Sequence, residues 1–149
     1  MKWLDINYMV VGGFLTIQSL WDMKHREILI SISLIGTVGG IFGVIFAERN
    51  FGDLLFAIIP AGICFIFSKL SHGALGLGDA IVLAVMAFYC SLEQILSICV
   101  VAFSIAAIVA LYLIIIAHKK GDYQIPFVPF LWIGWLIDML LLIEDKLYG

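Results

Sequence analysis

Long apolar segments alternate along this chain with short polar stretches that hold most of the charged residues. A helix that crosses the hydrocarbon core of a membrane needs about 20 predominantly apolar residues. The pattern therefore predicts an all-α, polytopic membrane protein with about six transmembrane helices. Their expected bounds are residues 3 or 6 to 21, 28–47, 54–68, 75–91, 95–117 and 126–143.

Some residues inside these segments are of types that shape membrane helices. Pro60 lies within the third segment and should kink it, because proline lacks the N–H that a helix interior requires. The first segment has aromatic residues suited to the membrane interface: Trp3, Tyr8 and Trp21. The second segment has glycines that allow a neighbouring helix to approach closely: Gly36, Gly39, Gly40 and Gly43.

Composition supports a membrane protein, since 64% of the 149 residues are hydrophobic and only 13% are charged. A net charge of −3 offers no basic surface for nucleic acid. The three cysteines lie in apolar segments without C-x-x-C spacing, so we expect buried apolar side chains rather than a zinc site or disulfides. No linker-like stretch divides the chain, and residues 1–149 are expected to form one membrane-embedded domain.

Lysine and arginine are unevenly divided between the two sets of connecting stretches. The stretches after the first, third and fifth segments contain Lys24, Arg26, Lys69, Lys119 and Lys120, and the other side contains Lys2, Arg49 and Lys146. Cytoplasmic loops are the richer in these residues. We therefore expect a multi-pass protein of the plasma membrane with both termini outside. Asp22 and Asp79 then lie on the same cytoplasmic face, at the end of the first segment and the start of the fourth.

Asp79 follows a glycine-rich stretch, residues 73–78, at the start of an apolar segment where an uncompensated charge is costly. Alone, Asp79 would suit a helix cap, and Asp22 would suit a solvated acid beside Lys24 and Arg26. Two carboxylates held close together instead share one proton. The ionised member can take a proton from water while the protonated member polarises a peptide carbonyl. This is the chemistry of an aspartic peptidase, and it requires no metal.

Three stretches of the chain resemble motifs of the prepilin peptidase family. Residues 22–28 (DMKHREI) resemble the stretch around the first aspartate, residues 76–79 (GLGD) resemble the G-x-G-D motif, and residues 125–130 (IPFVPF) resemble the proline-rich start of the last helix. The resemblance implies an aspartic membrane peptidase with Asp22 and Asp79 as catalytic residues and no cofactor. Substrate binding or support of the motifs is implied for Gly76, Gly78, Pro126 and Pro129.

The resemblance also implies a substrate class. Such enzymes remove the short basic leader of type IV pilin-like or preflagellin precursors at the cytoplasmic face of the membrane. Larger members have an N-terminal cysteine-rich domain linked to N-methylation; this chain has no paired cysteines, so we expect cleavage without methyl transfer. Leu29, Ile81 and Val128 stand where the family often has proline, lysine and glycine.

Other interpretations of the polar residues remain open at this point. A small ion-coupled transporter could use the two aspartates to bind a cation, and a secretion-system scaffold could use the glycine faces to bind partners. Asp138 lies within the last segment on the side opposite the aspartate pair, so a structural or snorkelling role is expected. Asp53 and Glu93 are expected at helix starts or in loops. The histidines could gather a metal with the aspartates, although no metal-ligand spacing supports this: His25, His72 and His118.

Overall fold

The structure is a computed structural model that describes residues 2–46, 50–70, 76–115 and 125–148, with side chains described only between residues 6 and 144. Every regular element in these ranges is helical, which confirms the all-α prediction. The helices are α1 (Lys2–His25), α2 (Ile30–Phe46), α3 (Phe51–Ala57), α4 (Ile59–Leu70), α5 (Leu77–Ala87), α6 (Leu92–Ile115) and α7 (Val128–Tyr148).

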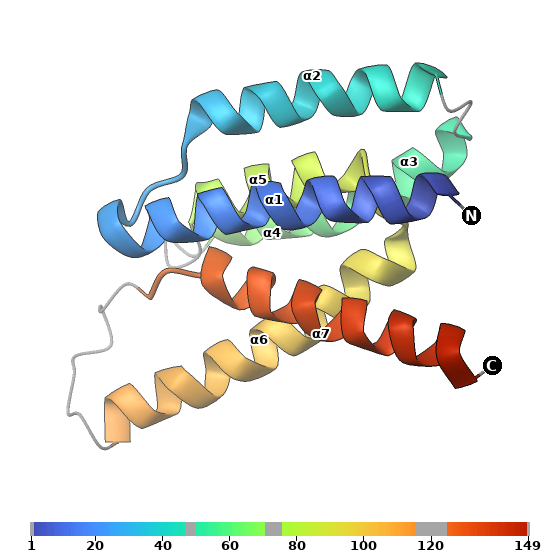
Figure 1. Ribbon diagram of the computed structural model, residues 1–149. Helices are drawn as coiled ribbons and strands as arrows, with labels where there is room; N and C mark the ends of the chain where they lie inside the picture. Colours follow the sequence, from blue (N-terminus) through green and yellow to red (C-terminus); the bar gives the residue numbers. More distant parts are fainter. Residues whose placement is uncertain (1, 47–49, 71–75, 116–124, 149) are drawn as a thin grey trace.

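The helices run back and forth between the two ends of a bundle, which lie at the left and right of Figure 1. One end holds the last residues of α1, α4 and α6 together with the first residues of α2, α5 and α7. We call it the motif end, because the three stretches 22–28, 76–79 and 125–130 all lie there. Both chain termini lie at the opposite end (Figure 1).

Pro60 interrupts the third predicted segment, as expected. The break between α3 and α4 lies at Ile58, and Pro60 is the second residue of α4. Proline has no N–H to donate to the carbonyl four residues earlier, that of Phe56, so the helical hydrogen-bond pattern cannot continue unbroken. The predicted kink is therefore confirmed.

Only two helices in the described part of the chain are long and apolar enough to cross a membrane by themselves. They are the broken helix Phe51–Leu70 and α6, Leu92–Ile115, with mean hydropathies of 2.0 and 3.0. The apolar helices α2 and α5 have 17 and 11 residues, fewer than the roughly 20 that a span needs. The fourth predicted segment is shortened because α5 begins only at Leu77 and gives way to a turn after Ala87.

Glycines bring α2 close to α5 and to the turn that follows it. A Cβ at Gly36, Gly39 or Gly40 would come within 3.0 Å of a neighbouring side chain, which confirms the close packing predicted for these three. At Gly43 a Cβ would meet nothing within 4 Å, so the prediction is wrong for this residue. The Tyr89 hydroxyl donates to the carbonyl of Gly36 at 2.6 Å and fastens the two elements.

The first and last helices, α1 and α7, pack antiparallel along their length. Three cross-helix hydrogen bonds join them: Tyr8 to Asp138, Trp132 to Thr16 at 2.9 Å, and Val128 to Asp22 at 3.3 Å. Between the first two, a Cβ at Gly12 would lie only 2.3 Å from the Trp135 ring, so glycine is needed for this approach. The contacts fix the register of α7 against α1 from one end of the bundle to the other.

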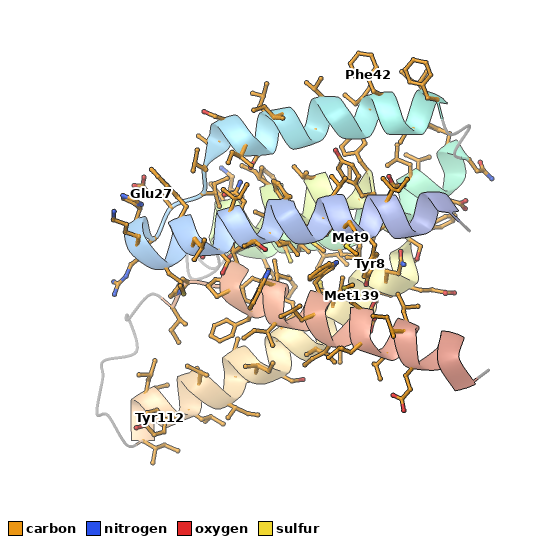
Figure 2. The ribbon with its side chains drawn as sticks, viewed as in Figure 1. Tyr8, Met9, Glu27, Phe42, Tyr112 and Met139 are labelled. Atoms are coloured by element: carbon orange, nitrogen blue, oxygen red, sulfur yellow. The ribbon has the colours of Figure 1, made fainter. Side chains whose placement is uncertain are left out.

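Tyr8 and Asp138 form the contact farthest from the motif end. Tyr8 is buried and lies on the side of α1 that faces α7 (Figure 2), so its prediction as an interfacial anchor is wrong. A tyrosine suits either place, because its ring is apolar and its hydroxyl needs a polar partner. Asp138 is buried as well and accepts the Tyr8 hydroxyl, so it does not snorkel and has the structural contact expected of a buried acid.

The core lies where α1, α5, α6 and α7 meet. Its largest fully buried apolar side chains come from these four helices: Leu15, Leu83, Met86, Ile95, Ile98 and Leu131. The three cysteines, Cys64, Cys90 and Cys99, are buried and not disulfide-bonded, as predicted. Asp53 and Glu93 lie in the first turns of α3 and α6, which confirms their placement at helix starts.

Candidate active site

Asp22 lies in the last turn of α1 and is only 6% exposed. Its Oδ2 accepts a hydrogen bond from the backbone N–H of Val128 at 3.3 Å. Val128 is the first residue of α7, and the N–H groups of a first helical turn have no partner within their own helix. The carboxyl group also faces the positive end of the α7 dipole. Asp22 therefore joins the first motif to the start of the last helix.

Asp79 is the third residue of α5 and is 9% exposed. Gly76 is the N-cap and has no side chain to satisfy the helix start; the Asp79 carboxyl reaches back and is hydrogen-bonded to the Gly76 backbone. An acid at this position makes the same reciprocal contact in a capping box. Asp79 thus supports the helix start, but from the third helical position and not as the N-cap itself.

The carboxyl groups of Asp22 and Asp79 lie close enough to interact electrostatically. They reach this position because α1 ends and α5 begins at the same end of the bundle (Figure 1). The two acids that the sequence analysis singled out are thus brought together from helices more than 50 residues apart, as expected from their shared face. Both are buried, so each is largely removed from bulk water.

Gly78 and Ile28 bring the first and second motifs into direct contact. A Cβ at Gly78 would lie 2.7 Å from Ile28 Cγ2, well inside van der Waals distance. At Gly76 a Cβ would lie 3.2 Å from Asp79 Oδ2. The backbone of Gly76, with φ −65° and ψ 134°, is open to any residue, so glycine there avoids a tight contact with Asp79 and is not demanded by the backbone conformation.

Pro126 and Pro129 shape the start of α7 and are both half-buried. Pro129 is the second residue of the helix, where a missing N–H costs nothing. Pro126 precedes Phe127. The Phe127 carbonyl accepts the N–H groups of Phe130 and Leu131, and the Phe127 ring packs against Phe103 of α6 at 4.7 Å between centroids. The two prolines therefore help set where Val128 presents its N–H to Asp22.

Gln18 is a buried polar residue that the sequence analysis did not single out. Its amide oxygen accepts the N–H of Leu29 at 2.9 Å, and its amide nitrogen donates to the Leu29 carbonyl and to the Ser33 hydroxyl. The family often has proline at the position of Leu29, and proline has no N–H to donate to Gln18. A glutamine within an apolar segment, one helical turn before Asp22, was the signal that could have identified it.

Cys64 and the histidines complete the polar groups near the motif end. The Cys64 thiol, on α4, lies close enough to Asp79 to interact electrostatically, another neighbour that the sequence gave no reason to expect. His25 stacks on Trp21 with ring centroids 4.0 Å apart. His72 and His118 lie outside the described residues. Among the residues that are described, no group of three or more histidine, cysteine or acidic side chains is placed to hold a metal.

Comparison with known proteins decides the family. A model of the type IV leader peptidase family matches residues 9–114. The chain belongs to this family. The match spans both acids and the glycines beside Asp79, and it ends before the late proline-rich stretch, so the part played by α7 rests on the structure. No curated protein and no solved structure matched the chain.

Family membership confirms the resemblance carried by the first two motifs. It makes the chain a prepilin-type peptidase, and the apolar helices fit a protein associated with the membrane. A peptidase needs a group that activates water and a group that polarises the carbonyl. Two buried carboxyl groups close to each other, as Asp22 and Asp79 are among the described residues, have the chemistry for both tasks.

Proposed function

We propose that this peptidase is an aspartic endopeptidase whose catalytic residues are Asp22 and Asp79. One observation carries the proposal: two acids from different helices, each more than nine-tenths buried, have carboxyl groups close enough to interact electrostatically. Burying two negative charges side by side is unfavourable, and sharing a proton relieves the repulsion. A pair in that state contains both a base and an acid.

The reaction follows from the shared proton. The ionised carboxylate accepts a proton from a water molecule as the water oxygen attacks the peptide carbonyl carbon. The protonated carboxyl donates a hydrogen bond to the carbonyl oxygen, on which negative charge develops. Proton transfer to the amide nitrogen then lets the amine leave as the C–N bond breaks. Gly76 and Gly78 support the pair by allowing Asp79 and Ile28 to approach the start of α5 closely.

The substrate is a type IV pilin-like or preflagellin precursor, cut between its short basic leader and its hydrophobic helix. In this proposal the chain crosses the membrane about six times, with the motif end at the cytoplasmic face. Three observations support it: the helices alternate in direction, both termini lie at the end opposite the acids (Figure 1), and Lys24 and Lys69 flank the motif end.

The test is cleavage of such a precursor by the purified protein in detergent. Asp22→Asn and Asp79→Asn should each lower kcat by about 10³-fold or more, and the double variant should be no worse than either single one, because the two groups act as a unit. Asparagine at position 79 keeps an acceptor for the Gly76 backbone, so helix capping is preserved. Near wild-type cleavage by folded Asp79→Asn protein would refute the proposal.

A transporter or a scaffold would respond differently to the same substitutions. In a transporter, the substitutions would abolish ion-dependent uptake, and precursor cleavage would not depend on them. In a scaffold, both substitutions would be tolerated. The family match favours the peptidase over either alternative.

A further inference from the structure

Gln18 has all of its amide hydrogen atoms in hydrogen bonds although its side chain is completely buried. The oxygen accepts from Leu29 N–H at 2.9 Å, and the nitrogen donates to the Leu29 carbonyl at 3.0 Å and to Ser33 Oγ at 2.8 Å. A buried amide with both donors and its acceptor used is held in one orientation. We call this set of bonds the Gln18 latch.

The Gln18 latch holds the residue at which the second helix begins. The carbonyl of Leu29 also accepts the N–H groups of Ile32 and Ser33, so Leu29 is the N-cap of α2. Residues 26–29 form the non-helical connection that brings the chain to this point. Because Gln18 grips both the N–H and the carbonyl of Leu29, α1 determines where this connection ends.

Two further contacts carry the effect of the latch to the aspartates. Gln18 lies four residues before Asp22, so the two side chains point from the same face of α1. Ile28, which directly precedes Leu29, is the residue against which Gly78 packs, and Gly78 directly precedes Asp79. The latch is therefore one helical turn from Asp22 and is linked to Asp79 through the contact of Ile28 with Gly78.

We propose that Gln18 is a positioning residue for the aspartate pair, which it aligns by holding Leu29 so that Ile28 stays against Gly78. The inference rests on the proposed function of Asp22 and Asp79. Gln18 neither touches the reacting atoms nor supplies a proton. It keeps the end of α1 and the start of α5 at the separation that allows the two carboxyl groups to act together.

Gln18→Met tests the latch, because methionine has a similar length and flexibility but neither amide donors nor the amide acceptor. We expect kcat for a precursor with a basic leader and a hydrophobic helix to fall at least about tenfold, with KM within about twofold. Gln94→Met is the matched control: the Gln94 amide oxygen also accepts a backbone N–H at 2.9 Å, that of Ser91, at the far end of the bundle. It should keep wild-type kcat.

Coupling to Gly78 separates positioning from a general loss of folding. Gln18→Met and Gly78→Ala disturb the same contact, so the double variant should lose less than the product of the two separate losses. If Gln18→Met only lowered the folded fraction, its loss of activity would be independent of that of Gly78→Ala, and the two losses would multiply in the double variant. All rates are referred to protein that is monodisperse by gel filtration, and multiplicative losses would overturn the proposal.

A second variant keeps the test decisive where Gln18→Met does not fold. Ser33→Ala removes one bond of the latch and should lower kcat about threefold; unchanged kcat in Ser33→Ala, or wild-type kcat in folded Gln18→Met, would overturn the role of Gln18. Asp79→Asn is assayed alongside. Loss of cleavage in Asp79→Asn supports the proposed function regardless of the result for Gln18→Met. The catalytic role of Asp79 and the positioning role of Gln18 can therefore be refuted independently.

Discussion

Replacing Gly78 with alanine should harm activity without harming stability. The added Cβ would lie 2.7 Å from Ile28 Cγ2, whereas ordinary contact begins at 3.4 Å, so the Ile28 side chain or the start of α5 must move by about 0.7 Å. A misplacement of about 1 Å near reacting groups can cost about 100-fold in rate. We expect Gly78→Ala to lower kcat by roughly 10- to 100-fold, since the displaced residue directly precedes Asp79.

The same substitution should raise the thermal stability of the protein or leave it unchanged. Gly78 is the second residue of α5, and alanine favours a helix over glycine by up to about 1 kcal/mol. The free energy gained by α5 offsets the strain at Ile28. A thermal melt in detergent should therefore show a Tm no lower than that of the wild type, while cleavage of the precursor is slowed.

Substitutions of Ile28 test whether its contact with the new Cβ causes the loss of activity. A Cβ at Gly78 would lie 2.7 Å from Cγ2, 3.2 Å from Cγ1 and 3.5 Å from Cβ of Ile28. Ile28→Ala removes both close atoms and should restore much of the lost kcat in the Gly78→Ala background. Ile28→Val keeps both and should restore nothing. Wild-type kcat in Gly78→Ala, or equal rescue by alanine and valine, would refute the contact as the cause.

Further predictions concern metal, topology, packing and the far polar contact. EDTA should leave cleavage intact, and loss that Zn²⁺ restores would indicate a metal enzyme. In intact cells, cysteine at Lys69 should resist an impermeant thiol reagent while cysteine at Asn50 reacts, and the reverse pattern would place the acids outside. Gly134→Ala should destabilise the protein by about 1–3 kcal/mol, because its Cβ would lie 2.5 Å from a backbone oxygen of α6, whereas Gly13→Ala, in open space, should be tolerated in a thermal melt. Asp138→Asn should retain most kcat and most stability because the amide can still accept the Tyr8 hydroxyl, and Asp138→Leu should lower the Tm.

The features that the sequence predicted well depend on local pattern and chain direction. Apolar length located the helices, and Pro60 located a break, because proline acts through its own backbone. The meeting of Asp22 with Asp79 could be predicted because helices that alternate in direction put alternate connections at the same end. Length was less reliable as a guide to membrane crossing, since α5 has only 11 residues before its turn.

The contacts that complete the site could not be predicted in the same way. Val128 donates to Asp22 through its backbone, and a backbone N–H is present at almost every position. Gln18 acts on Leu29 only because α1 and α2 fold back on each other. The prediction for Tyr8 fails because its partner, Asp138, lies 130 residues away in the sequence. Each of these depends on three-dimensional proximity that no local pattern encodes.

The bond between Asp22 and Val128 has a consequence for the order of synthesis. The two residues are 106 positions apart, and α7 is synthesised after α1 to α6. Both acids are therefore made long before the group that holds one of them in place. A nascent chain that has reached the membrane with α1 to α6 has its acids but not the finished site. The proposed catalytic pair is therefore complete only after α7 has been synthesised and has packed against α1.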